Sequence, residues 1–456
     1  MTNQFARSVS AGLCLLAVFT SSCTKTTGSI QVNSTPTGAM VWLDFDSTGK
    51  VTNCRFDNVQ PGHHALTARL AGYRDYDASA DVIAGQTAVV DCPLSRPRYA
   101  WMIQYSPGEQ ANGRSVAPVS DGYVVAGGLG DASDFDLAVL KFDLLGQVCW
   151  TKRYVFGLYV QELAQAMVPV GDGGFAICGF SWERGDSGDA WLARIDSQGD
   201  TLWAKGIGRG REDVACDLVQ TSDGGFAAAG YIWTCDSLMY DVFLVRTDAD
   251  GDTLWTRSWG GQYFDIASGI VQTPDGGFML AGYTDSYGGG YRNFWVLRTD
   301  ADGDTLWTRT YGGASNEECS SIARTSDNCY VLAGYTQSYG AGRLDYYLVK
   351  IDDSGNVLWT RTYGGANDDW AYSVRQTFDG GYAVCGYNQS GTTAAWLVKT
   401  DANGETLWTR TYNPEGNACE GYCVRQTPDS GYVITGAGGG NVLVLIKTDT
   451  RGYATP

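Results

Sequence analysis

Short apolar stretches separated by glycine-rich turns predict β-strands along most of the chain. Between residues 28 and 95 four such stretches occur, SIQV, AMVWLDF, HALTARL and AVVDCPL. Turn residues separate them at Pro36–Ala39, Pro61–Gly62 and Ala71–Tyr73. Alternating apolar and polar positions bounded by such turns are typical of strands. We therefore expect a small β-sandwich at residues 28–95.

From residue 96 to residue 456 one unit repeats seven times. The tryptophans that mark it are Trp101, Trp150, Trp203, Trp255, Trp307, Trp359 and Trp408. Successive members lie 49, 53, 52, 52, 52 and 49 residues apart. Two further phrases, of which DGGFMLAGY and FWVLRTD are examples, recur once in every unit. A fixed period of this length indicates a propeller, a solenoid or an array.

Each unit contains four short strands, for example SGIVQT, GGFMLAGY, FWVLRTD and TLWTRTY, which together are the content of one propeller blade. Glycines and β-branched residues interrupt every helical face, which excludes a helical solenoid. The series begins with a lone tryptophan strand and ends after a third strand, so the strand around Trp101 can complete the last blade. We predict an all-β chain: a small β-sandwich, then a seven-bladed β-propeller closed by this N-terminal strand, with each tryptophan packed between blades.

The segment 28–95 resembles a PEGA domain, a small β-sandwich of bacterial envelope proteins that serves as an accessory or attachment module. The residues that carry the resemblance are Pro36, Gly38, Ala39, Pro61, Gly62, His64, Gly72, Tyr73 and Gly85. The resemblance implies a structural role for His64. It implies no catalytic activity.

The repeated unit resembles the tryptophan-docking repeats of quinoprotein-type propellers, because an aspartate, a glycine three positions later and a tryptophan four beyond that recur. Dehydrogenases of that type typically have eight blades, a pair of adjacent cysteines and dedicated calcium ligands. This chain has seven units and no adjacent cysteines. The resemblance therefore implies the blade and not the enzyme.

The N-terminus has the pattern of an export signal. Arg7 precedes the apolar run AGLCLLAVF, and small residues lead to Cys23. The pattern resembles a bacterial lipoprotein signal, with Thr20 where leucine is usual. We expect a signal peptide at residues 1–22, lipidation of Cys23 and a linker at 23–27, placing the protein at the bacterial outer membrane or cell surface. The alternative is ordinary secretion.

Composition excludes several classes of function. A net charge of −18 argues against a nucleic-acid partner, which needs a clustered basic surface. Two adjacent histidines, His63 and His64, leave little scope for imidazole metal sites or histidine-based triads. Export permits disulfides, and Cys54 with Cys92 is the best candidate pair, worth about 3–4 kcal/mol if formed.

Aspartate-rich turns are a candidate calcium site. The segment RTDADGDTLWTR occurs twice and supplies the alternate aspartates Asp248, Asp250, Asp252, Asp300, Asp302 and Asp304. A calcium ion needs about six to eight converging oxygens, however, and most of the seven copies lack the middle carboxylate. A hairpin turn needs only the first aspartate and the glycine. Comparison of the seven copies therefore favours the hairpin turn. Calcium bound by the two identical copies stays open as the alternative, and no other cofactor is expected.

A carboxylate recurs ten residues before the aspartate of the DGG phrase. Its five copies are Glu162, Asp213, Asp265, Glu317 and Asp369. Equivalent positions of a propeller form a circle, so these side chains could capture a cation or a basic ligand at the channel mouth. The alternative is that each one accepts backbone hydrogen bonds at a tight turn.

Variable loops on the same face carry aromatic residues: Trp182, Trp233, Tyr287, Tyr291 and Tyr339. Loops on a rigid scaffold commonly bind ligands, although these rings could also pack over the blades. We expect a non-catalytic, surface-anchored binding or scaffold protein whose partner is a glycan or a protein, with membrane contact only through the lipid. The alternatives are an extracellular glycan hydrolase or lyase using channel-mouth carboxylates and a purely structural envelope component.

Overall fold

The computed structural model describes residues 26–35, 37–70, 76–94, 100–131, 135–156, 161–182, 188–208, 212–234, 239–289 and 291–454. The chain divides after residue 98 into two compact units. Both consist of β-strands, apart from one 3-10 turn, η1 (Pro414–Gly416). In these ranges no helix is long and apolar enough to cross a membrane. The expected signal peptide and Cys23 lie outside the described residues.

The first unit is a β-sandwich of two sheets. Its strands are β1 (Gly28–Thr35), β2 (Met40–Leu43), β3 (Asp46–Val51), β4 (Cys54–Val59), β5 (Gly62–Arg69), β6 (Tyr76–Val82) and β7 (Thr87–Pro93). One sheet has the order β4-β1-β7 and the other β3-β2-β5-β6. Alternate residues such as Ile30, Val32, Val41 and Leu66 are buried between them. His64 has a structural contact, since its Nδ1 lies 2.7 Å from Asp44.

The predicted disulfide between Cys54 and Cys92 is wrong, because both thiols are free. Cys54 on β4 pairs with Val32 of β1, and Cys92 on β7 pairs with Ser34 of the same strand. Strand β1 therefore lies between the two cysteines. Neighbouring strands are about 4.8 Å apart, so two strand spacings exceed the separation of about 7 Å that a disulfide can bridge.

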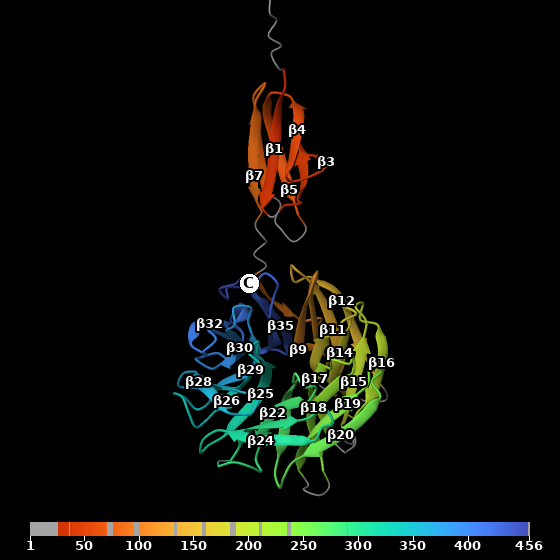
Figure 1. The fold of residues 1–456 in the computed structure, drawn as a ribbon, viewed down its shortest axis with the longest axis vertical. Helices are drawn as coiled ribbons and strands as arrows, with labels where there is room; N and C mark the ends of the chain where they lie inside the picture. The colour runs from red at the N-terminus through yellow and green to blue at the C-terminus, as the bar shows by residue number, and fades with distance from the viewer. Residues whose placement is uncertain are drawn as a thin grey trace, which may run out of the picture. The chain divides into compact units, whose positions relative to one another are not determined.

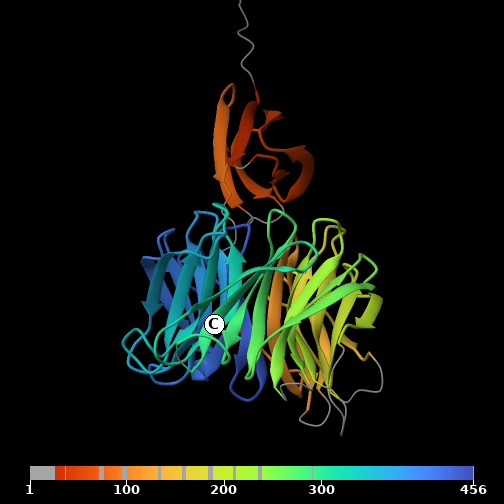
Figure 2. The ribbon, with the colours of Figure 1, turned by 60° about the horizontal axis from the view of Figure 1, so that its bottom comes forward.

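The second unit is a propeller (Figures 1 and 2). Five of its seven four-stranded blades are separate sheets, and the first two form one eight-stranded sheet because Phe135 pairs with Gln161. Its first strands are β9 (Gln110–Val119), β13 (Gln161–Pro169), β17 (Asp213–Gln220), β21 (Asp265–Gln272), β25 (Glu317–Arg324), β29 (Asp369–Gln376) and β33 (Cys419–Gln426). Its second strands are β10 (Gly122–Gly130), β14 (Phe175–Trp182), β18 (Phe226–Trp233), β22 (Phe278–Thr284), β26 (Tyr330–Thr336), β30 (Tyr382–Asn388) and β34 (Tyr432–Gly438). Its third strands are β11 (Phe135–Asp143), β15 (Asp189–Ile195), β19 (Tyr240–Thr247), β23 (Asn293–Thr299), β27 (Asp345–Ile351), β31 (Ala394–Thr400) and β35 (Val442–Lys447). Its fourth strands are β12 (Val148–Tyr154), β16 (Thr201–Gly206), β20 (Thr253–Trp259), β24 (Thr305–Tyr311), β28 (Val357–Tyr363), β32 (Thr406–Tyr412) and β8 (Trp101–Tyr105).

The first strands of the blades form a closed ring around the propeller axis. Each contacts the first strand of the next blade, and β33 contacts β9. Figure 1 shows β9, β17, β25 and β29 near the centre and β20, β24 and β28 at the periphery. Strand β8 pairs with β35 and so completes the last blade, which confirms the predicted closure.

A tryptophan joins each blade to the next. In six copies the ring lies against the glycine of the turn between the third and fourth strands of the following blade. In the seventh it lies against Gly452, in the turn that follows the third strand β35. The contacts are Trp101–Gly146, Trp150–Gly199, Trp203–Gly251, Trp255–Gly303, Trp307–Gly355, Trp359–Gly404 and Trp408–Gly452. These glycines have φ between +77° and +82°, and a Cβ at any of them would lie only 2.5–3.2 Å from the neighbouring side chains. The predicted packing of tryptophans between blades is confirmed.

A buried cation on each third strand forms an ion pair with the aspartate of the DGG phrase. The pairs are Lys141–Asp121, Arg194–Asp172, Arg246–Asp223, Arg298–Asp275, Lys350–Asp327, Lys399–Asp379 and Lys447–Asp429. The cationic side chains are 1–9% exposed. A buried cation is costly unless it is paired, so each pair ties the third strand to the turn between the first and second strands.

Gly251→Ala tests the contact between tryptophan and glycine, with Gly224→Ala as its matched control. Both glycines have positive φ, +80° and +90°, but a Cβ on Gly224 meets no atom within 4 Å. Alanine at Gly224 should cost about 1–2 kcal/mol of unfolding free energy through backbone strain alone. At Gly251 it must also displace the ring of Trp203, which adds about 1–3 kcal/mol. Denaturant unfolding measures both losses, and equal losses would contradict the contact.

Asp275→Asn tests the ion pair with Arg298. Hydrogen bonds from Thr273 and Arg298 lower the pKa of Asp275 to about 2. The charge of Asp275 therefore stabilises the fold above the ordinary value of 3.8, and this contribution is lost as pH falls toward 2. We expect the variant to lose about 1–2 kcal/mol at neutral pH and to approach the native chain in acid. Melting temperatures across this range measure the difference, and Asp250→Asn, which removes the same charge from an exposed turn residue, is the control.

Candidate functional site

The carboxylates predicted at the channel mouth are buried at the starts of the first strands. Glu162, Asp213, Asp265, Glu317 and Asp369 are each at most 1% exposed. Three of them accept a hydrogen bond from the amide of a glycine four residues earlier, at 2.8 Å in every case: Gly261 for Asp265, Gly313 for Glu317 and Gly365 for Asp369. This is the arrangement expected if the carboxylates hold tight turns.

Further bonds complete the environment of these carboxylates. Asp265 accepts hydrogen bonds from the hydroxyls of Thr284 and Ser286, and Glu317 accepts one from Thr336 at 2.8 Å. Burial raises the pKa of both Asp265 and Asp369. A ligand approaching the loop face would therefore meet the turns that these carboxylates hold rather than the carboxylates.

The aspartate-rich segments form hairpin turns. Asp248 Oδ1 accepts hydrogen bonds from the amides of Asp250 and Asp252, at 3.0 and 2.8 Å, and the carboxylate of Asp252 pairs with Lys205. Asp300 accepts the same two bonds in the next copy, from Asp302 and Asp304. Among the described residues no three His, Cys, Asp or Glu side chains are placed to hold a metal ion. The calcium site considered for these six aspartates is therefore not assembled in the structure.

The aromatic residues predicted to bind a ligand differ in their environments. Tyr287 and Tyr339 are about half exposed, but their hydroxyls donate to the carbonyls of Gly260 and Gly312, at 2.7 and 3.0 Å. They occupy equivalent positions of the fourth and fifth blades and cap the turns there. These two rings are packed as well as exposed.

The other predicted aromatics divide in the same way. Trp233 is half-buried against Tyr240, with ring centroids 5.3 Å apart, and Trp182 is 46% exposed beside Phe180. Tyr291 is 82% exposed. Of the five, Tyr291 presents the largest free surface to a partner.

A groove of about 430 Å³ lies beside Tyr291 on the loop face of the fourth blade. Its lining residues come from three loops. They are Tyr263 before β21, Asp285, Tyr291 and Arg292 between β22 and β23, and Asn316 before β25. The two tyrosines expose flat apolar rings, while the other three residues offer hydrogen-bonding groups.

The groove has a rigid polar wall around Arg292. Its guanidinium binds both oxygens of Asp285, with distances of 2.9 and 3.2 Å, and Glu318 at 3.2 Å. It also lies 3.9 Å from the centre of the Tyr283 ring. Such a partnered guanidinium is held in one orientation. The groove is therefore preformed along this wall.

Four of the groove residues were not predicted: Tyr263, Asp285, Arg292 and Asn316. Asp285 and Arg292 stand in the same variable loop as Tyr291. Tyr263 and Asn316 stand in the turn GGxxx before the carboxylate position, where the other copies carry different residues. Variability within this otherwise repeated turn is the signal that would have found them.

Comparison with known proteins supports the two-part organisation. Residues 27–98 match the family model of the PEGA domain, which confirms the resemblance found in the sequence. The regulatory protein FlaEY of Caulobacter vibrioides is 29% identical over 206 residues, covering 40% of this chain and 21% of that protein. The chain thus spans about a fifth of the length of this relative.

Solved structures are similar to the propeller. The WD40 domain of Pan2 from Neurospora crassa has a TM-score of 0.50 at 12% identity, covering 78% of this chain and 97% of that one. The WD40 domain of coronin from Toxoplasma gondii has a TM-score of 0.47 at 8% identity, covering 77% and 87%. The likeness to the Pan2 domain shows a WD40-type propeller fold and nothing of function. The resemblance to quinoprotein-type repeats stays a prediction.

Asp265→Ala tests whether these carboxylates hold the turns. Removing the side chain leaves the amide of Gly261 and two hydroxyls without their acceptor, so we expect a loss of about 1–3 kcal/mol of unfolding free energy. Asp302→Ala removes an equal charge from an exposed turn position and should change stability by no more than about 0.5 kcal/mol. Denaturant unfolding of the two variants makes the comparison, and a native-like stability of Asp265→Ala would contradict the turn role.

Proposed function

We propose that the chain is a non-catalytic binding or scaffold protein whose propeller presents the groove beside Tyr291 to a glycan. The fold supports the general role, since a PEGA domain is followed by a WD40-type propeller. The groove supports the ligand class. Exposed rings next to fixed hydrogen-bonding side chains match the alternating apolar faces and hydroxyl edges of a sugar.

The size of the groove favours a glycan segment over a flat protein surface. At about 430 Å³ it falls within the range of about 300–1,000 Å³ typical of small-ligand sites. Its polar residues are preoriented by the Arg292–Asp285 pair, which reduces the entropy lost on binding. The exposed rings of Tyr263 and Tyr291 are the surfaces on which a sugar would stack.

The environment of the carboxylates supports binding rather than hydrolysis. A glycosidase needs two carboxyl groups that reach the scissile bond, whereas Asp213, Asp265 and Asp369 are at most 1% exposed. The rival hydrolase or lyase would have to open these turns to use them. A purely structural envelope role is the remaining alternative, and it predicts no ligand.

We further propose that the protein is exported and held at the cell surface by a lipid on Cys23, or else secreted. The PEGA domain supports export, because such domains occur in extracellular or periplasmic proteins. The matched relative is named as a regulatory protein. A regulatory role through ligand binding would be compatible with this proposal.

Tyr291→Ala should weaken glycan binding without destabilising the fold, because the side chain is 82% exposed. We expect about a tenfold or greater loss of affinity, comparable with the removal of one stacked aromatic ring. A glycan array identifies the ligand for the full chain, and titration compares the variants. Phe378→Ala removes another exposed ring, from the turn between β29 and β30, and serves as the matched control. Binding of proteins from an envelope extract but of no glycan would overturn the assigned ligand class.

A further inference from the structure

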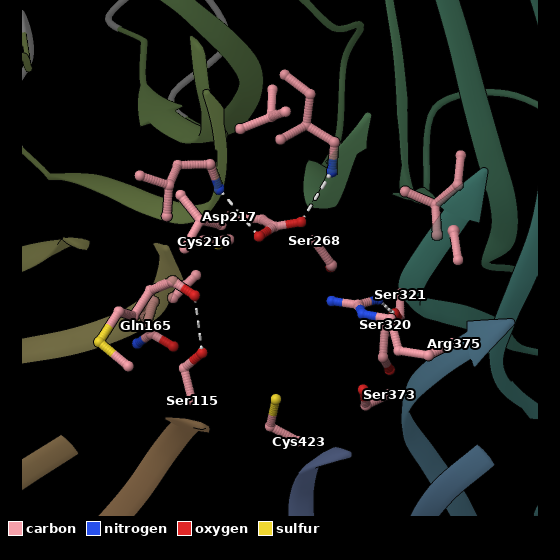
Figure 3. A pocket seen from close by; sticks show the side chains of 18 of the residues that line it. Ser115, Gln165, Cys216, Asp217, Ser268, Ser320, Ser321, Ser373, Arg375 and Cys423 are labelled. Atoms are coloured by element: carbon pink, nitrogen blue, oxygen red, sulfur yellow. Dashed lines mark hydrogen bonds between the residues drawn. The ribbon is translucent and has the colours of Figure 1, made fainter. Parts of the chain in front are cut away.

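A second cavity, of about 430 Å³, lies on the propeller axis (Figure 3). Its lining residues come from all seven first strands, which is why it is distinct from the groove on the loop face. Each first strand carries a β-bulge near its middle. The extra residue of a bulge has no partner in the ladder and redirects its side chain. Gln165, Cys216, Ser268 and Ser320 are four of these residues, and Figure 3 shows them around the cavity.

The residues after the bulges hold the cavity wall together across blade boundaries. Ser373 Oγ accepts a hydrogen bond from the amide of Val424 in the next blade, at 3.4 Å. Asp217 accepts bonds from the amides of Leu218 and of Ile270 in the next blade, at 2.9 and 3.1 Å. The wall is therefore built from fixed groups, and both carboxylate oxygens of Asp217 are already used by the backbone.

The charge of the cavity is opposite to that of the chain. The whole protein carries −18, yet the charged residues that line the cavity are four arginines and one aspartate. The arginines are Arg324 on β25, Arg375 on β29, Arg425 on β33 and Arg114 on β9. These four strands are consecutive around the ring. Positive charge is therefore concentrated on one arc of the channel.

Two of these arginines form no ion pair with a carboxylate of the described residues. Arg375 Nη1 donates to the carbonyl of Val374 at 2.8 Å and to Ser321 Oγ at 3.4 Å. Arg425 Nη1 donates to the carbonyl of Val424 at 3.0 Å and contacts Cys423 Sγ at 3.2 Å. Neither forms an ion pair with a carboxylate of the described chain. A guanidinium has five N–H donors, so each retains donors for a further acceptor.

The two arginines also repel each other. They occupy equivalent positions of adjacent blades, and burial together with the charge of Arg425 lowers the pKa of Arg375 to about 10. The guanidinium nevertheless stays protonated at neutral pH. Asp217 is the one carboxylate of the lining, and burial raises its pKa although the charges of Arg375 and Arg425 oppose this shift. The cavity thus contains positive charge that its own residues do not balance.

Aromatic rings lie beside the arginines on the same side of the channel. The Tyr372 and Tyr422 rings lie 5.3 Å apart, and the guanidinium of Arg114 lies 4.6 Å from the centre of Tyr422. Trp370 stacks on Tyr372 at 5.4 Å and donates to the hydroxyl of Ser320 at 2.9 Å. This side of the channel offers hydrogen-bond donors and ring faces.

We propose that the propeller channel is a binding site for the oxyanion group of a small ligand, held between Arg375 and Arg425. Carboxylate, sulfate and phosphate groups share the chemistry that a pair of guanidinium groups recognises. The cavity is large enough for such a group together with the small molecule that carries it. The bound anion supplies the counter-charge that the lining lacks. This site is independent of the glycan groove.

Titration of the full chain with sulfate, phosphate and malonate tests the proposal. Each is compared with chloride at matched ionic strength by calorimetry and by thermal melting. We expect at least one oxyanion to bind and to raise the melting temperature, since a ligand of the folded state stabilises it. The strongest of the three identifies the acid group. If none binds at millimolar concentration, the proposal is overturned.

Arg375→Gln and Arg425→Gln provide the decisive comparison. Each should weaken oxyanion binding about tenfold or more. Each should also raise the melting temperature of the anion-free protein, because repulsion between the two cations is removed. Arg343→Gln removes the same charge from an exposed side chain and is the control. Unchanged anion binding in both channel variants would overturn the site. Tyr291→Ala should leave anion binding unchanged, because Tyr291 lines the groove and not the channel cavity. This variant therefore separates the anion proposal from the glycan proposal.

Discussion

The propeller depends on one contact repeated seven times, in which a tryptophan ring lies against a glycine of the next blade. The contact requires a residue without a Cβ, and the turn at the same position requires positive φ. Glycine satisfies both demands at once. Trp101 on β8 makes the same contact with Gly146, so the last blade is joined to the first in the same way as the other blades. Because β8 also pairs with β35, the ring of blades is closed. The buried ion pairs then act within each blade, whereas the tryptophans act between blades.

Much of the fold could be predicted because the repeat displays its constraints seven times. The tryptophan, the Asp-x-x-Gly turn and the DGG phrase recur at fixed spacing. Comparing the seven copies therefore separates the residues that the blade requires from those that occur by chance. The buried cation of the third strand recurs in FWVLRTD and its relatives, but the sequence does not show which carboxylate it pairs with. An ion pair between positions about twenty residues apart follows from strand pairing rather than from local pattern. The prediction of a Cys54–Cys92 disulfide was wrong for a related reason, because the sequence does not show that β1 lies between β4 and β7.

The two proposed binding sites were less predictable because they depend on departures from the repeat. Tyr263 and Asn316 are single substitutions in a repeated turn, and Arg375 and Arg425 stand where the other blades have small or apolar residues. The unusual residues form a site only in the folded ring, where equivalent positions of neighbouring blades lie close together. Conversely, the recurrent carboxylates looked functional because they recur. In the structure this recurrence reflects a turn that every copy must form.

The pairing of β8 with β35 has a consequence for how the chain folds. Residues 101–105 must find residues 443–447, so the last blade is assembled from the two ends of the propeller sequence. Contacts between such distant segments form slowly because the entropy of closing a long loop must first be overcome. During synthesis strand β8 therefore emerges early and stays unpaired until the last blade has been made. A partly made chain carries an exposed strand and an unfinished blade, which makes it a target for chaperones and a source of intermolecular pairing.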